Sequence, residues 1–489
     1  MSEAIENILI LPEGKTLEFK RDISSPKPIL KTLTAFANTA GGKLIIGISD
    51  SKTVIGVENP LDEEEKLCSI IADSIAPKLV PNVELVTYQD KTLLVVEVFL
   101  SSLRPHYLKA EGSDRGVYVR LGSTNRLADK ELIEELRRSV DGVAFDEMPM
   151  PGLKVDNLDL NAATELFGRN DELTEKELLT LKILTKYQGR LIPTKGAVLL
   201  FGKERISHFP DAWIQCGRFI GKDKSEIFDH TDIYDPLPLA VESIMHFLKK
   251  NAIKGADFSK TRRQDVWSIP LTILREAVIN AIVHSDYSQR GAPIRISFFD
   301  DRIEVENPGI LLPGMTIEDM KQGISRIRNP VIARIFRELN FIEQWGSGVR
   351  RIFKEAKEKG LPEPQIIEIG MRLRFIIPFA ELHTTQVEAQ VEAQVEAQVD
   401  IDILSVCSSN PISSAELAKA LGHKQLSGNI RKAIPRLRET GLLEYTIPDK
   451  PRSRNQKYKL TQKGQNMKIA ITNREIANER GKTDIRNDN

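Results

Sequence analysis

Three polar side chains recur at every fourth residue of an apolar segment, namely Glu276, Asn280 and His284. Four residues advance about 400° around an α-helix, so the three side chains form one stripe along it. The residues beside the stripe are apolar, which predicts that the rest of the helix is buried and that the stripe lines a cavity. There a carboxylate can orient or deprotonate water, and an amide oxygen can bind Mg²⁺. The alternative is a buried helix whose polar groups are merely satisfied.

This segment, Glu-Ala-Val-Ile-Asn-Ala-Ile-Val-His, resembles the N-box of the GHKL nucleotide-binding family, which includes gyrase, certain chaperones and histidine kinases. The resemblance implies ATP and Mg²⁺ as cofactors. It makes Glu276 the general base of an ATPase, Asn280 the magnesium ligand and His284 a residue that contacts the cofactor.

The residues after the N-box extend the resemblance. Segments 294–299 and 302–306 alternate as the two strands of a hairpin, and the second ends in Glu-Asn-Pro-Gly. GHKL proteins have Asp-x-Gly-x-Gly at this point, and their Asp reads the amino group of adenine. In this chain Glu306 or Asn307 must take that role, and Gly309 is the glycine that matches.

Two more glycines, Gly346 and Gly348, precede a predicted helix at 349–359. Glycines before a helix N-terminus let backbone amides approach phosphate oxygens. The resemblance to a divergent GHKL branch attached to AlbA-type domains places both glycines at the cofactor. Arg326 and Arg328 lie between the hairpin and this loop, where each contacts phosphate or forms a salt bridge.

Length and composition set the frame for these motifs. A chain of 489 residues is too long for one core and predicts about three domains. Lys+Arg and Asp+Glu both total 69, so a nucleic-acid surface must be local. The three cysteines stand far apart and are expected to be reduced. Neither a signal peptide nor a membrane span is visible, so a cytoplasmic protein without a membrane partner is expected.

The N-terminal third resembles the Schlafen AlbA-type domain. The resemblance is carried by Leu-Glu-Phe-Lys at 17–20, by the helix-to-strand segment at 35–48 and by the segment at 116–125. We expect a helix at 28–40 followed by a strand at 43–49. An α/β fold for this domain follows from the resemblance.

In the Schlafen branch, three acidic residues form a metal-dependent RNA-cleaving centre, and Glu13, Glu18 and Asp50 match their positions. If these carboxylates converge, they could hold Mg²⁺ or Mn²⁺ and generate the attacking water. The alternative is a structural role, in which Glu18 pairs with a neighbouring cation and Asp50 belongs to a turn. A further alternative is that the domain binds nucleic acid without cleaving it, through phosphate contacts of Lys20, Arg21 and Arg120.

The C-terminal region combines a repeat with a basic module. Residues 386–399 repeat Val-Glu-Ala-Gln, which predicts a helix that serves either as a spacer or in self-association. Residues 400–465 fit a winged helix-turn-helix, with helices near 401–407, 414–421 and 426–440 and wing strands at 442–447 and 456–460. Its candidate nucleic-acid-binding residues are Arg431, Lys432, Arg436, Arg452 and Arg454.

The predicted fold class is therefore α/β and α+β multidomain: an AlbA-like domain, a GHKL α/β sandwich and a winged helix. The expected boundaries are 1–146 for the AlbA-type domain, 147–205 for a linker and mostly helical bridge, 206–380 for the GHKL domain, 381–399 for the repeat helix, 400–465 for the winged helix and 466–489 for a flexible tail. We expect an ATP-binding regulator that contacts DNA or RNA and forms a homo-oligomer. The alternative is a metal-dependent endoribonuclease in host defence.

Overall fold

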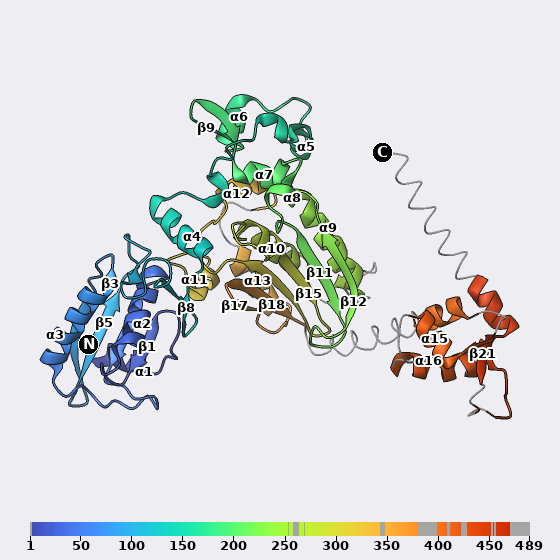
Figure 1. Cartoon of the computed structure of the whole chain (residues 1–489), viewed down its shortest axis with the longest axis horizontal. Coiled ribbons are helices and arrows are strands. Elements are labelled where there is room, and N and C mark those ends of the chain that lie inside the picture. The colour runs from blue at the N-terminus through green and yellow to red at the C-terminus, as the bar shows by residue number, and fades with distance from the viewer. Residues whose placement is uncertain are drawn as a thin grey trace. The chain divides into compact units, whose positions relative to one another are not determined.

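The structure of the 489-residue chain is a computed structural model (Figure 1). It describes residues 2–252, 254–257, 264–267, 269–342, 348–379, 399–407, 411–421, 428–450, 453 and 456–469. The chain forms two compact units, Met1–Ala380 and Glu381–Asn489, and each is considered by itself. None of the helices in the described ranges combines the length and the apolar surface that crossing a membrane requires.

The first domain is built on a four-stranded sheet in the order β1-β2-β5-β4. The strands are β1 Leu17–Lys20, β2 Gly42–Ile46, β4 Asn82–Tyr88 and β5 Lys91–Val98. β1 and β2 run parallel, whereas the other neighbours are antiparallel. A parallel pair needs a crossover connection, and helix α2 (Pro26–Asn38) supplies it. The predicted helix and the strand after it are confirmed.

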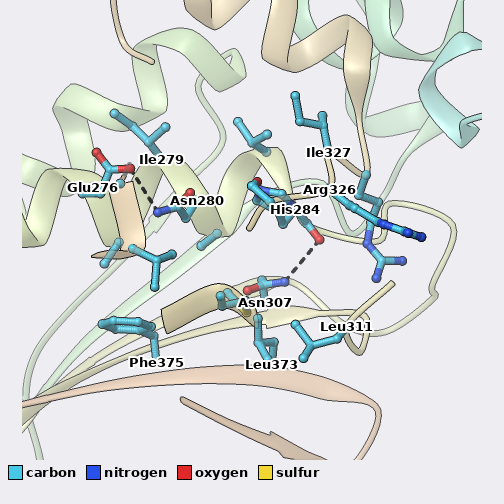
Figure 2. Close-up of a pocket in the computed structure, with 18 of the residues that line it drawn as sticks. Glu276, Ile279, Asn280, His284, Asn307, Leu311, Arg326, Ile327, Leu373 and Phe375 are labelled. Carbon is cyan, nitrogen blue, oxygen red and sulfur yellow. Dashed lines mark hydrogen bonds between the residues drawn. The ribbon is translucent and has the colours of Figure 1, made fainter. Parts of the chain in front are cut away.

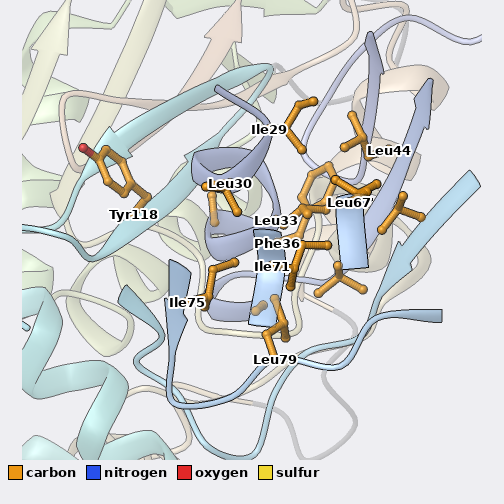
Figure 3. Close-up of a cluster of buried hydrophobic side chains, with 14 of the residues drawn as sticks. Ile29, Leu30, Leu33, Phe36, Leu44, Leu67, Ile71, Ile75, Leu79 and Tyr118 are labelled. Carbon is orange, nitrogen blue, oxygen red and sulfur yellow. The ribbon is translucent and has the colours of Figure 1, made fainter. Parts of the chain in front are cut away.

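Strand β2 separates two cores. Leu44 and Ile46 pack with Phe36 of α2 and with α3 (Pro60–Ser74) in the cluster shown in Figure 3. Ile45 belongs to a second cluster, which contains Ile5 of α1 (Ser2–Leu9). Successive side chains of a strand point to opposite faces, so the apolar end of β2, Leu44 to Ile46, is covered on both sides.

Several short strands and helix α4 complete the first domain. They are β3 Ile75–Ala76, β6 Tyr107–Leu108, β7 Tyr118–Leu121 and β8 Thr124–Leu127, and α4 spans Lys130–Asp141. Arg120 on β7 is 1% exposed and forms an ion pair with Glu18 of β1. The side chain of Asp129 caps the start of α4, and Gly142 ends the helix with a φ of 68°, a value that glycine adopts without strain.

The bridge contains a hairpin that the sequence analysis missed. The elements are η1 Phe145–Glu147, η2 Val155–Asn157, α5 Leu160–Leu166, α6 Glu175–Thr180, β9 Leu184–Tyr187, β10 Arg190–Pro193, α7 Lys195–Phe201 and α8 Arg205–His208. The prediction of a mostly helical bridge is wrong at β9 and β10. Gln188 and Gly189 both have positive φ, which is the geometry of a tight two-residue hairpin turn.

The second domain of this unit is a six-stranded sheet covered by helices. Its strand order is β12-β11-β15-β16-β18-β17, and β11 and β15 are the parallel pair. The strands are β11 Ile214–Phe219, β12 Ile227–Ile233, β15 Ile294–Phe298, β16 Arg302–Pro308, β17 Gln365–Ile369 and β18 Arg372–Pro378. The predicted hairpin is confirmed as β15 and β16.

The helices of this domain position the N-box. They are α9 Leu237–Asn251, α10 Leu271–Val283, α11 Ile317–Gln322, α12 Pro330–Glu338 and α13 Gly348–Glu358, with a small hairpin of β13 Lys254–Asp257 and β14 Gln264–Trp267. Helix α10 packs against β16 and also against α9, α12 and α13. It is therefore enclosed on several sides, as its apolar surface predicts.

The C-terminal unit has a small core of its own. It contains a helix at 399–406, β19 Ile412–Ser413, α15 Ser414–Ala420, α16 Gly428–Glu439, β20 Leu443–Tyr445, β21 Lys457–Leu460 and a helix at 462–469. The sheet order is β19-β21-β20, and the core includes Leu404, Leu417, Leu437 and Tyr458. The repeat at 386–398, Arg452, Arg454 and the tail beyond 469 lie outside the described residues.

We expect Arg120→Ala to lower the free energy of unfolding of the first domain by up to about 3–5 kcal/mol, because the buried carboxylate of Glu18 then keeps only the partly exposed Lys20 as an ion-pair partner. Urea unfolding of the full chain measures the change. The control is Arg126→Ala on β8, where the side chain is exposed and the loss should stay within about 0.5 kcal/mol. Equal losses in the two variants would contradict the expectation.

Candidate functional site

The polar stripe of α10 lines a cavity of about 390 Å³, as Figure 2 shows. Glu276, Asn280 and His284 all face it, so the prediction that the stripe lines a cavity is confirmed. Most of the wall is apolar, and it comes from α10, from β16 and β18, from α13 and from the segment after β16. The apolar residues include Ile279, Val305, Ile310, Leu311, Leu373 and Phe375.

Glu276 and Asn280 are joined to each other and to α13. The side-chain nitrogen of Asn280 donates to Oε1 of Glu276 at 3.2 Å. Arg351 donates to Oε2 of Glu276 at 2.7 Å. Because the amide nitrogen of Asn280 faces the carboxylate, its amide oxygen is the atom that is oriented to accept from, or bind to, a ligand in the cavity.

His284 stands directly after the last turn of α10. Its backbone N–H donates to the carbonyl of Asn280 at 2.9 Å, and its own carbonyl accepts from Asn307 at 3.4 Å. Burial, followed by the nearby charge of Arg328, lowers the pKa of His284 to about 4. The imidazole is therefore neutral at pH 7, and it can donate or accept a hydrogen bond but carries no charge.

Strand alternation decides between Glu306 and Asn307. Asn307 lines the cavity and is 5% exposed, and its amide nitrogen also donates to the carbonyl of Pro308 at 3.1 Å. Glu306 is not among the residues that line the cavity. It pairs instead with Arg372 and Arg374, and although burial alone would raise its pKa, the hydrogen bond from Arg374 and the charge of Arg372 lower it. Of the two predicted cofactor residues, Asn307 therefore faces the cavity, and Glu306 is held in ion pairs on the other face of the strand.

The glycines approach the cavity closely. Gly309 has a φ of 98°, and a side chain there would lie 2.9 Å from the Cβ of Asp286 and 3.1 Å from the guanidinium carbon of Arg328. A side chain on Gly348, at the start of α13, would collide with the carboxylate of Glu276. Both positions require glycine for these reasons. Gly346 lies outside the described residues.

The charged residues of the wall are mainly cationic. Arg326, Arg328, Arg337 and Arg351 line the cavity, whereas Glu276 is the only acidic residue in its described lining. This excess of positive charge favours an anionic ligand. The sequence analysis singled out Arg326 and Arg328 but missed Arg337 and Arg351, although Arg351 stands one helical turn after Gly348.

Arg328 also reaches the first domain. It is 7% exposed, forms an ion pair with Glu135 of α4 and donates to the carbonyl of Ile310. Ile310 itself packs in a cluster with Leu132 and Leu136 of α4. One wall of the cavity is therefore part of the contact between the two domains.

The candidate nuclease carboxylates do not form a metal site. Glu13 accepts from the backbone N–H of Phe19 at 2.8 Å, and Glu18 forms ion pairs with both Lys20 and Arg120. Across the described part of the chain, no three His, Cys, Asp or Glu side chains are grouped so that they could hold a metal ion, and Asp50 joins no such group. The carboxylate of Glu18 is instead paired with cations from its own strand and from β7.

The predicted nucleic-acid-binding residues differ in accessibility. Arg120, one of the predicted phosphate contacts, is buried and paired with Glu18. The side chain of Lys20 is 31% exposed and pairs with Glu18, whereas that of Arg21 is 73% exposed. In the C-terminal unit Arg431 and Lys432 are exposed on α16, and Arg436 is paired with Asp400.

Comparison with protein families gives three matches along the chain. Residues 13–129 match the family Schlafen, AlbA_2. Residues 291–377 match HATPase_c_4, described as putative ATP-dependent DNA helicase recG C-terminal. Residues 397–461 match the Fic-like C-terminal domain of filamentation induced by cAMP protein. The second match begins after the N-box helix, so Glu276 and Asn280 lie outside it.

No curated protein matches the chain, but several solved structures resemble it. The DIP2311 protein from Corynebacterium diphtheriae has 20% identity, with 95% of this chain and 97% of that chain covered and a TM-score of 0.41. The N-terminal domain of a putative ATP-dependent DNA helicase RecG-related protein from Nitrosomonas europaea has 30% identity over 26% of this chain and 90% of that chain, with a TM-score of 0.21. A Fic family protein from Desulfovibrio desulfuricans G20 has 14% identity over 69% and 77% of the two chains, with a TM-score of 0.12.

We expect the buried imidazole of His284 to make stability depend on pH. Its pKa is about 4 in the folded chain and about 6.5 as a free side chain, so between these values the unfolded chain binds more protons. The contribution of His284 to the free energy of unfolding is therefore lost as pH falls from 6.5 to 4.

Urea midpoints at pH 7.5 and pH 5 measure this effect in the wild type and in His284→Gln. The variant cannot take up the proton, so its midpoint should fall less between the two pH values. A pH dependence that is identical in both proteins would show that His284 does not titrate as the geometry requires.

Proposed function

The chain carries a Schlafen AlbA_2 domain and a domain that matches the putative ATP-dependent DNA helicase recG C-terminal family, and we propose that it is an ATP-binding regulator that contacts nucleic acid. The observation that carries this proposal is the convergence of Glu276, Asn280 and Asn307 on one cavity with a cationic wall. A carboxylate, an amide oxygen and an apolar cleft lie together there, as a nucleoside triphosphate with a divalent cation requires.

Adenine recognition is assigned to Asn307. Its amide nitrogen is used by two backbone carbonyls, at 3.4 Å and 3.1 Å, which leaves the amide oxygen to accept from the amino group of the base. The apolar residues Val305, Leu373 and Phe375 provide surfaces for the flat ring. An amide oxygen thus replaces the carboxylate that the family pattern has at this point.

The residues present also fit a magnesium ion. Mg²⁺ usually keeps several waters and binds through one or two protein oxygens together with the phosphates, and the amide oxygen of Asn280 would be such a ligand. The bound ion would neutralise charge on the phosphate oxygens. For hydrolysis Glu276 is the residue placed to accept a proton from water, and the arginines hold the phosphates.

Contact with nucleic acid is proposed for both ends of the chain. Helix α16 presents Arg431 and Lys432 to solvent, and we interpret the C-terminal unit as a winged helix that places this helix on DNA. In the first domain Arg21 is exposed, whereas Glu18 is occupied by cations. This charge distribution favours binding of phosphates without cleavage.

The nucleotide would act on the first domain through the shared wall of the cavity. Arg328 lines the cavity and pairs with Glu135, and Ile310 packs on α4. Next to them, the backbone N–H of Gly314 donates to the carbonyl of Thr39 at 2.7 Å. A phosphate that draws Arg328 toward the cavity would loosen its pair with α4, which gives the ligand a direct effect on the domain contact.

We expect Asn280→Ala to weaken binding of Mg²⁺-ATP by about 10- to 100-fold, because one oxygen ligand of the cation is lost. Isothermal titration calorimetry with the full chain measures the affinity. The difference should disappear in EDTA, and Asn82→Ala, an exposed asparagine on β4, should bind like the wild type. Failure of the wild type to bind ATP would disprove the proposed function.

We expect Mg²⁺-ATP to change the affinity of the wild type for labelled duplex DNA by about fivefold or more. Glu135→Gln should abolish this change while ATP still binds, because the neutral side chain no longer holds Arg328 as an ion. Fluorescence anisotropy measures the DNA affinity with and without nucleotide.

Glu134→Gln is the matched control, since Glu134 is on the same helix and pairs with Arg137 at the surface, with both side chains 45% exposed. It should keep the response to ATP. If Glu135→Gln responds like the wild type, the coupling does not pass through Arg328.

A further inference from the structure

The carboxylate proposed as the general base is engaged at both oxygens. Arg351 donates to Oε2 of Glu276 at 2.7 Å, and Asn280 donates to Oε1 at 3.2 Å. The Cα of Gly348 lies so close to this carboxylate that no side chain fits between them. Glu276 is therefore held by α13 as well as by its own helix, and the positive charge of Arg351 makes this carboxylate a weaker acceptor of a proton from water.

Arg351 is also placed to meet the ligand. It lies one helical turn after Gly348 and lines the same cavity as Asn280. Its side chain is 38% exposed, whereas that of Glu276 is 14% exposed, so the arginine is the more accessible partner of the pair. A guanidinium binds phosphate through a fork of parallel hydrogen bonds, and such charge-assisted pairs are stronger than neutral ones.

If a triphosphate were bound with its cation held by Asn280, a phosphate would lie near Glu276, because the two side chains are hydrogen-bonded, and the two anions would compete for one guanidinium. We propose that Arg351 recognises the terminal phosphate of ATP and that its ion pair with Glu276 keeps the site inactive until that phosphate is bound. This inference rests on the proposed ATP-binding function of the cavity.

In this proposal, binding of the terminal phosphate starts the hydrolysis of ATP. Arg351 moves from Glu276 to the γ-phosphate, and the freed carboxylate accepts a proton from water. The water oxygen forms a bond to the γ-phosphorus, the bond between this phosphorus and the β,γ-bridging oxygen breaks, and ADP and inorganic phosphate are the products. When the phosphate leaves, Glu276 gives up its proton to solvent and Arg351 pairs with it again.

The test compares a triphosphate with a diphosphate. Calorimetry with Mg²⁺ and the full chain gives the affinities for the non-hydrolysable analogue AMP-PNP and for ADP. Arg351→Ala should weaken AMP-PNP binding by about 10- to 100-fold and ADP binding by less than about threefold, since the lost contact is made to the terminal phosphate. Arg350→Ala removes the same charge from an exposed neighbour on α13 that does not line the cavity, and it should change neither affinity.

Glu276→Gln should have the opposite effect on binding. The amide no longer competes for Arg351, so AMP-PNP binding should tighten by about two- to fivefold, as expected for release of a partly exposed ion pair. Release of phosphate from ATP should be lost in this variant, because the amide cannot accept the proton. Tighter binding without turnover is an outcome that a purely structural ion pair does not produce.

The outcomes separate the two hypotheses. If the wild type binds neither AMP-PNP nor ADP, the ATP function itself is wrong. If the wild type binds both and Arg351→Ala weakens both equally, the ATP function stands and the role of Arg351 in recognising the terminal phosphate is overturned. Should Arg351→Ala fail to fold, Arg351→Gln preserves the length of the side chain, and the same ratio of affinities decides.

Discussion

The burial of α10 is the constraint on which the candidate site depends. Eight of its residues are buried and apolar, and the helix packs against β16, α9, α12 and α13. Rotation of the helix by one residue would turn Glu276 or Asn280 into these apolar contacts, at a cost of several kcal/mol for the charged group. The packing therefore fixes the direction of the polar stripe, and the geometry of the cavity follows from it.

A second constraint is that the cavity and the domain contact share their residues. Gly309 is pressed between Asp286 and Arg328, and the segment after it carries Ile310 into the core under α4. The buried pair of Arg328 and Glu135 is weak evidence for stability, because the desolvation of two charges offsets their attraction. Its position has another consequence: an anion in the cavity can compete for Arg328, whereas an apolar pair in its place would be indifferent to any ligand.

The sequence predicted the features that depend on local periodicity. The four-residue spacing of Glu276, Asn280 and His284 gave the helix and its exposed stripe, and the two-residue alternation gave β15 and β16. The same alternation could have excluded Glu306, since Ile303, Val305 and Asn307 share one face of β16. A polar turn around Gly189 is also readable from the sequence, although the two strands that flank it were not predicted.

Other features could not be read from local patterns. Glu18 and Arg120 are separated by 102 positions, and Glu135 and Arg328 by 193, so no periodicity connects them. The first pair forms where β7 contacts β1, and the second pair forms where α4 contacts the second domain. The sequence leaves both roles of Glu18 open, because a carboxylate that binds a metal and one that is buried against an arginine look alike in a sequence.

The distribution of charge explains why we propose ATP binding and hydrolysis for the second domain and contact with nucleic acid for the other domains. In the first domain Glu18 is satisfied by Arg120 and Lys20, so its negative charge is not offered to a cation, while Arg21 remains at the surface. In the second domain the pattern is reversed, since the arginines face inward around a cavity that has one glutamate in its described lining. Phosphates of a polymer can be bound on the first kind of surface, but a small anion can be enclosed and kept from water only in the second. Because Arg328 belongs to that wall and also to the contact with α4, the proposed binding of a small anion would act on a residue that the first domain contacts directly.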